Sequence, residues 1–171
     1  MPTPPYEPVD AADLAVVRDQ LGREPRGVVG IAARCVCGNP VVVATAPRLP
    51  DGTPFPTFYY LTHPAAIVAM SQLEAGRVMP ELAELLHDPD VAAAYRDAHD
   101  AYIADRERYG RVPEIEGVSA GGMPTRVKCL HALAGHALAA GPGVNPIGDE
   151  ALARARWSPA RCECAAPGDA A

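Results

Sequence analysis

Three short apolar runs in the first part of the chain constrain its fold more than any other feature. They span residues 28–33, 40–45 and 58–61 and are rich in valine, isoleucine or aromatic residues, a composition typical of β-strands. Strands joined by short connections usually pair with their neighbours in sequence. The sequence therefore predicts a three-stranded antiparallel meander, which buries too little area to be stable by itself.

The segments around these runs carry the signals of helices. Asp10 and Asp88 are suited to cap a helix N-terminus, and Gly22 is suited to end a helix. We therefore expect an α+β fold, with a small three-stranded antiparallel sheet packed against several helices on one of its faces. The predicted helices span residues 11–21, 63–73, 80–87, 89–109, 123–140 and 148–157.

The length of the chain and the distribution of its prolines predict one domain with two loose ends. Residues 1–9 hold four prolines and are expected to form a flexible N-terminal tail. Residues 10–157 form the predicted α+β domain. Residues 158–171 show no apolar period and are expected to form a disordered C-terminal tail.

Composition excludes several classes of protein. Apolar residues make up 49% of the chain, which is enough for a packed core and argues against global disorder. The net charge of −6 does not favour nucleic-acid binding, which depends on cationic side chains. No stretch approaches the roughly 20 apolar residues of a membrane span. The N-terminus lacks the basic start and apolar centre of a signal peptide, so a cytoplasmic protein is expected.

The five cysteines are the main chemical signal. In the reducing cytosol they are not expected to form disulfides, and their spacing points instead to metal binding. Cys35 and Cys37 are separated by one residue, as are Cys162 and Cys164, whereas Cys129 stands alone. The second pair falls in the predicted disordered tail, and we interpret it as incidental.

Several unusual strings occur together in the chain, at residues 33–35, 47–49, 51–57, 60–64, 73–74 and 128–131. The sequence resembles an actinobacterial family known only as domain of unknown function five-zero-one, over roughly residues 25–150. The family pattern usually has cysteine at the position of His63, and cysteine and histidine can exchange while preserving a zinc ligand. The resemblance implies no reaction, fold or substrate. The strings DGTPFPT at residues 51–57 and VKCLH at residues 127–131 make the resemblance specific, because long strings of this kind rarely recur by chance.

The predicted meander places Cys35 and His63 at the same end of the sheet, because the first and third strands run in the same direction. Cys129 lies on the predicted helix 123–140 and is expected to face that end. The predicted ligands are therefore Cys35, His63 and Cys129, with Cys37 or His131 as the fourth. Zinc is the expected metal, although thiolates also hold iron–sulfur clusters.

A second candidate site precedes the predicted helix 123–140. Gly121 and Gly122 lead into this helix, and Arg126 and Lys128 follow. A glycine loop at a helix N-terminus exposes N–H groups that favour an anion. The alternative is that the glycines form an ordinary turn.

These observations leave two functions open. The first is a metal-pinned binding or regulatory module, in which four protein ligands close the coordination sphere. The second is a hydrolase-like, metal-dependent enzyme that acts on a small anionic substrate through metal-bound water. The expected partners are a small anionic ligand or another protein. A centre with three protein ligands and an open position would favour the enzyme.

Overall fold

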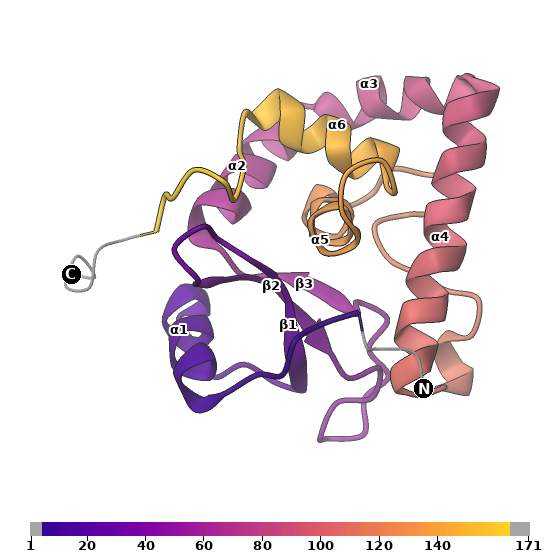
Figure 1. Ribbon diagram of the computed structural model, residues 1–171. Helices are drawn as coiled ribbons and strands as arrows, with labels where there is room; N and C mark the ends of the chain where they lie inside the picture. Colours follow the sequence, from indigo (N-terminus) through magenta and orange to yellow (C-terminus); the bar gives the residue numbers. More distant parts are fainter. Residues whose placement is uncertain (1–4, 165–171) are drawn as a thin grey trace.

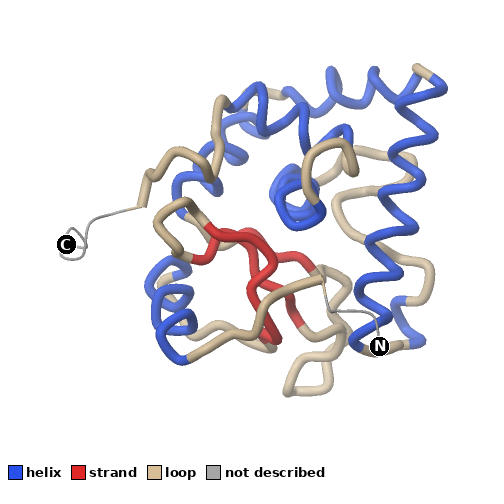
Figure 2. Tube along the Cα trace, in the orientation of Figure 1, coloured by secondary structure: helices blue, strands red, loops and turns tan. Residues whose placement is uncertain are grey.

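The computed structural model describes residues 5–164 of the chain. A three-stranded sheet lies at the centre, with helices on both of its faces (Figures 1 and 2). The strands are β1 (Val28–Arg34), β2 (Pro40–Thr45) and β3 (Tyr59–Leu61), in the order β1-β2-β3. Both neighbouring pairs are antiparallel, so the predicted meander and the α+β class are confirmed.

Helices cover both faces of the sheet, whereas the sequence predicted coverage of one. All residues of β2 are buried, because its continuous run of valines faces apolar side chains on each side. Helix α1 (Ala11–Leu21) covers one face through Val17, which packs with Ile31 and Val43. Helix α5 (Leu130–Ala140) covers the other face.

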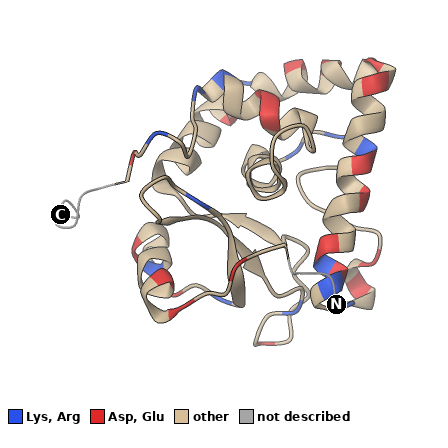
Figure 3. Ribbon diagram, in the orientation of Figure 1, with Lys and Arg blue, Asp and Glu red and all other residues tan. Residues whose placement is uncertain are grey.

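The remaining helices surround α5 in Figure 1. They are α2 (Pro64–Ala75), α3 (Val78–Glu84), α4 (Pro89–Tyr109) and α6 (Pro146–Ala155). Two short 3-10 helices, Leu85–His87 and Pro113–Ile115, flank α4. Charged side chains lie along α1 and α4, whereas α5 carries none (Figure 3). The uncharged α5 is thus the apolar centre of the helical layer.

The side chain of His136 in α5 contacts residues of β3, of α4 and of the N-terminus of α6. Its ring stacks on Tyr59 of β3, with the ring centres 5.7 Å apart, and meets Tyr102 of α4 edge-on. Asn145 lies 3.2 Å from its Nδ1 atom. Burial lowers the pKa of His136 to about 4, so the ring is neutral at physiological pH. His136 is therefore a core residue.

The helix predicted over 123–140 begins later, at Leu130. The carbonyl of Gly121 accepts hydrogen bonds from the N–H groups of Lys128 and Cys129, at 2.7 and 3.3 Å. Gly121 and Gly122 have positive φ angles of 70° and 97°, which glycine adopts without strain. The chain before Leu130 therefore folds back on the glycines and does not form the first helical turns.

Both predicted tails contain residues that form backbone hydrogen bonds with the rest of the domain. Glu7 pairs with Ile31 of β1 through two backbone hydrogen bonds. Residues 158–164, expected to be disordered, lie against the turn between β1 and β2, where Val36 donates to the carbonyl of Pro159 at 2.9 Å. Residues 1–4 and 165–171 of the predicted tails lie outside the described residues. Among the described residues, no helix combines the length and apolar character needed to cross a membrane.

Two candidate metal centres

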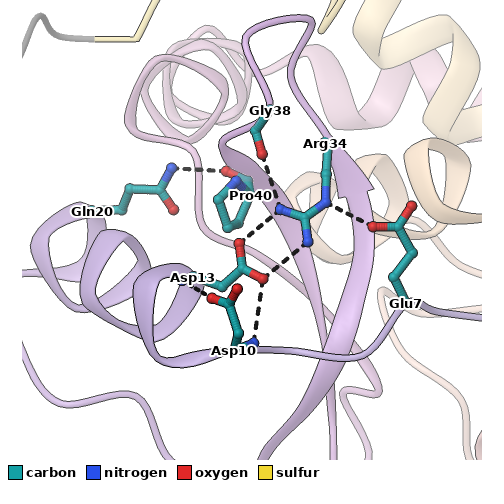
Figure 4. A network of polar contacts seen from close by, with 7 residues as sticks. All are labelled: Glu7, Asp10, Asp13, Gln20, Arg34, Gly38 and Pro40. Atoms are coloured by element: carbon teal, nitrogen blue, oxygen red, sulfur yellow. Dashed lines mark hydrogen bonds and ion pairs between the residues drawn. The ribbon is translucent and has the colours of Figure 1, made fainter.

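The turn that carries Cys35 and Cys37 is held in place by Arg34, the last residue of β1 (Figure 4). The Arg34 guanidinium donates two hydrogen bonds to Asp13 of α1, at 2.7 and 3.0 Å, and one to Glu7 at 2.7 Å. It also donates to the carbonyl of Gly38, inside the turn, at 2.9 Å. The contact with Arg34 lowers the pKa of Asp13. This network fastens the turn to α1.

The first candidate centre consists of four cysteines from two distant segments. Cys35 and Cys37 lie in the β1–β2 turn, and Cys162 and Cys164 lie in the segment after α6. The four sulfur atoms lie within 4.8 Å of one another. The cysteines are not joined by disulfides, and Cys37 Sγ and Cys164 Sγ are 3.5 Å apart. Two thiolates on one tetrahedral zinc ion are about 3.8 Å apart, since each Zn–S bond is about 2.3 Å long. The spacing is therefore compatible with four thiolates around one metal ion.

His63 lies beside this centre. It caps α2 at the end of the sheet, is fully buried and packs against Trp157. Its Nε2 atom is 3.2 Å from Cys164 Sγ, and no described residue pairs with its Nδ1 atom. Burial lowers the pKa of His63, which favours the neutral ring. A neutral ring protonated on Nε2 can donate to a thiolate of Cys164.

The thiols of Cys35, Cys37 and Cys164 differ in their readiness to lose a proton. A hydrogen bond from the backbone N–H of Asn39 is the main reason that the pKa of Cys37 is lowered to about 7. Burial raises the pKa of Cys164 to about 12 and also raises that of Cys35. Metal binding at this centre would therefore release protons from the thiols of Cys35 and Cys164, whose pKa values burial raises.

The second candidate centre lies where α2 meets the start of α5. Glu74, Cys129 and His131 each place one ligand atom within 4.8 Å of the others. His131 Nδ1 is 3.2 Å from Glu74 Oε1, and His131 Nε2 is 3.1 Å from Ser71 Oγ. The contact between the side chains of Cys129 and His131 lowers the pKa of Cys129 and raises that of His131. The thiolate and the imidazolium thus stabilise each other.

The structure divides the predicted ligand set between these two centres. It brings Cys35 and Cys37 together and places His63 next to them, but Cys129 and His131 lie in the second group. Cys129 occupies the N-cap position of α5, one residue before the helix begins. A single centre containing Cys35, His63 and Cys129 is therefore not what the structure forms.

Sequence reasoning missed three of the residues involved. Cys162 and Cys164 were interpreted as incidental, yet they complete the first centre. Their spacing repeats that of Cys35 and Cys37 and could have identified them as partners. Glu74 belongs to one of the strings that carry the family resemblance, but nothing in the sequence placed it near His131.

The residues predicted to bind an anion have a different setting from the one assumed. The carbonyls of Gly121 and Gly122 accept hydrogen bonds from the N–H groups of Lys128 and Arg126, respectively. The loop therefore closes on itself and does not lead directly into a helix. The side chains of Arg126 and Lys128 are exposed just before Cys129. Anion binding at these two side chains stays a prediction.

Comparison with known proteins gives a family and no activity. A family model described as "Protein of unknown function (DUF501)" matches residues 31–153, which is most of the chain. The match includes Cys35, Cys37 and all of the second group, whereas Cys162 and Cys164 lie beyond it. Searches of curated proteins and of solved structures found no match.

Proposed function

We infer the function from the residues of this chain, because the chain belongs to the DUF501 family, whose function is unknown. We propose that it is a zinc-pinned module in which Cys35, Cys37, Cys162 and Cys164 bind one metal ion. The ion fastens residues 158–164 to the β1–β2 turn at the end of the sheet.

The proposal rests on one observation, the convergence of two Cys-x-Cys pairs that are far apart in sequence. Outside this cluster, residues 158–164 contact the β1–β2 turn through the hydrogen bond from the N–H of Val36 to the carbonyl of Pro159. One backbone hydrogen bond contributes only about 1 kcal/mol. A structural zinc ion contributes far more, because the unfolded chain has no preformed site.

The ligand set favours a structural role for the metal. Four thiolates fill a tetrahedral zinc sphere and leave no position for water or substrate. An iron–sulfur cluster distributes its cysteines over several iron atoms and separates the sulfurs more widely. Zinc therefore fits the compact group of sulfurs better. A visible spectrum distinguishes the two metals, because a zinc protein is colourless.

The pinned segment also shapes a binding surface. A groove of about 400 Å³ lies between α2, α6 and this segment, and its lining includes Val68, Trp157, Arg161 and Glu163. Arg161 and Glu163 come from the segment that the metal holds, so metal loading completes one wall of the groove. A protein partner or a small anionic ligand that binds there would therefore respond to the metal. We place this module in the cytoplasm, where reduced thiols are available to the metal.

Limited proteolysis tests the proposal. Trypsin cleaves after Arg161, which is exposed in the middle of the segment. We expect zinc to protect this bond, an excess of chelator to expose it, and the Cys37→Ser variant to be cleaved in both conditions. The His131→Ala variant, altered only at the second centre, should keep its zinc-dependent protection. Equal cleavage rates with zinc and with chelator would show that no metal pins the segment.

A further inference from the structure

A carboxylate of α2 caps the first turn of α5. Glu74 lies in the last turn of α2, and its Oε1 atom accepts a hydrogen bond from the backbone N–H of Leu130 at 2.8 Å. The same oxygen lies 3.2 Å from Nδ1 of His131. A carboxylate has two oxygens and about four acceptor positions, so capping α5 leaves Glu74 able to bind a further group.

The ring of His131 is oriented by two residues of one helix. Ser71 and Glu74 are three positions apart on α2 and therefore lie on the same face. Ser71 Oγ contacts Nε2 of the ring at 3.1 Å, while Glu74 faces Nδ1. A histidine that binds a metal through one nitrogen usually donates the N–H of the other to a neighbouring acceptor. The hydroxyl of Ser71 supplies that acceptor.

Cys129 completes the group from the other side. It is the N-cap of α5, and its sulfur lies within 4.8 Å of the ligand atoms of Glu74 and His131. Two ligands bound at about 2.05 Å across a tetrahedral angle are about 3.3 Å apart, which agrees with the 3.2 Å between Glu74 Oε1 and His131 Nδ1. The side chains of Glu74 and His131 are each 27% exposed, so solvent reaches the group.

We propose that Glu74, Cys129 and His131 form a second zinc centre, with three protein ligands and an open fourth position. Its thiolate, imidazole and carboxylate are the ligand types that zinc accepts. The fourth position holds water or a small anion. This centre differs from the four-cysteine centre, whose sphere the protein closes, and it does not depend on that centre for its ligands or its geometry.

The open position gives this centre a different chemistry. Zinc lowers the pKa of a bound water to near neutrality and polarises a bound oxygen ligand. The exposed side chains of Arg126 and Lys128 precede Cys129 in the chain and add positive charge to this end of α5. The second centre is therefore where the chain would bind a small anionic ligand through a metal.

Metal stoichiometry and cobalt(II) spectroscopy test the proposal. We expect the parent protein to bind two equivalents of zinc, and His131→Ala and Cys37→Ser to bind one equivalent each. Glu74→Gln keeps an oxygen that can cap Leu130 but loses the charged ligand. We expect it to fold normally and to weaken the second centre by more than tenfold, since loss of even an outer partner weakens a metal site about 10- to 100-fold.

Cobalt(II) also reports on the open position. In the Cys37→Ser variant, where only the second centre remains, thiocyanate should change the cobalt spectrum, because it enters the fourth position. In the His131→Ala variant, where only the four-cysteine centre remains, thiocyanate should have no effect. The second centre is refuted if the Glu74→Gln and His131→Ala variants fold and both retain the zinc stoichiometry and affinity of the parent. It is also refuted if the parent binds a single equivalent of zinc and the Cys37→Ser variant binds none. Loss of metal from His131→Ala alone, with Cys37→Ser unchanged, would overturn the first centre and leave the second standing.

Discussion

His63 is a fully buried histidine whose two ring nitrogens have different surroundings. Nε2 faces the sulfur of Cys164, whereas Nδ1 has no hydrogen-bond partner among the described residues. An unpaired buried nitrogen is unfavourable, so packing against Trp157 alone does not explain a polar ring at this position. In the proposed first centre, Nε2–H would donate to the metal-bound thiolate of Cys164 and stabilise the charge on its sulfur.

Replacing His63 with leucine should therefore weaken zinc binding at the first centre. Leucine has no hydrogen-bond donor, and we expect a loss of affinity of about 10- to 100-fold. Competition with a chromophoric chelator measures this, in a His131→Ala background that leaves only the first centre. His87→Ala is the control, because His87 is exposed and pairs with Glu84. Unchanged affinity in His63→Leu would reduce His63 to a packing residue.

At the scale of elements, α1 supports the turn that carries Cys35 and Cys37 although it contributes no cysteine. Arg34 connects Asp13 of α1 to the carbonyl of Gly38 in the turn, and Gln20 of α1 donates to the carbonyl of Pro40 at 2.8 Å. Asp13 is 13% exposed, so water screens its contact with Arg34 only partly. Helix α1 thus fixes both ends of the turn that presents Cys35 and Cys37.

Asp13→Asn should destabilise the protein by about 1–2 kcal/mol, because it weakens a charged hydrogen-bonded pair. The folded-state pKa of Asp13 is lowered, so its contribution is complete above the usual aspartate range near pH 4 and is lost as the pH falls through the lower folded value. Denaturant unfolding of metal-free parent and variant between pH 7 and pH 2 measures this difference. A stability difference that stays constant over this range would contradict the assignment.

Local signals predicted most elements, and long-range contacts decided the exceptions. Asp10 and Asp88 cap α1 and α4 as expected, because a cap depends on residues within one turn. The start of α5 was misplaced because the chain before Leu130 folds back on the carbonyls of Gly121 and Gly122, and Glu74, which is remote in sequence, accepts from the N–H of Leu130. Cys162 and Cys164 were interpreted as incidental because they fall in the predicted disordered tail, and the cysteines that they meet lie more than a hundred residues earlier. Spacing identified the chemistry of the cysteines but could not assign them to two centres.

Across the whole molecule, the first centre joins the segment after the last helix to the turn after the first strand (Figure 1). Metal bound there would stabilise the folded state by an amount that grows with the logarithm of the ratio of free metal to Kd, about 2.7 kcal/mol at a free concentration 100-fold above Kd. For a chain of this length, that corresponds to a shift of roughly 5–10 °C in the melting temperature. The stability of the protein is thus expected to depend on metal supply.

Removing residues 158–171 should abolish this dependence. In the His131→Ala background, we expect chelator to lower the melting temperature of the full chain by roughly 5–10 °C and to leave the shortened chain unchanged. Thermal unfolding followed by circular dichroism measures both. An equal response of the two chains to chelator would show that the segment takes no part in metal binding.

The position of Cys162 and Cys164 also sets the order of events during synthesis. Every helix and strand of the described chain precedes them in sequence, so all of these elements are synthesised before the two thiols. The first centre can accept its ion in full only after that point. Metal capture would then mark a chain whose translation has passed α6, and a chain released earlier would carry Cys35 and Cys37 as a free pair.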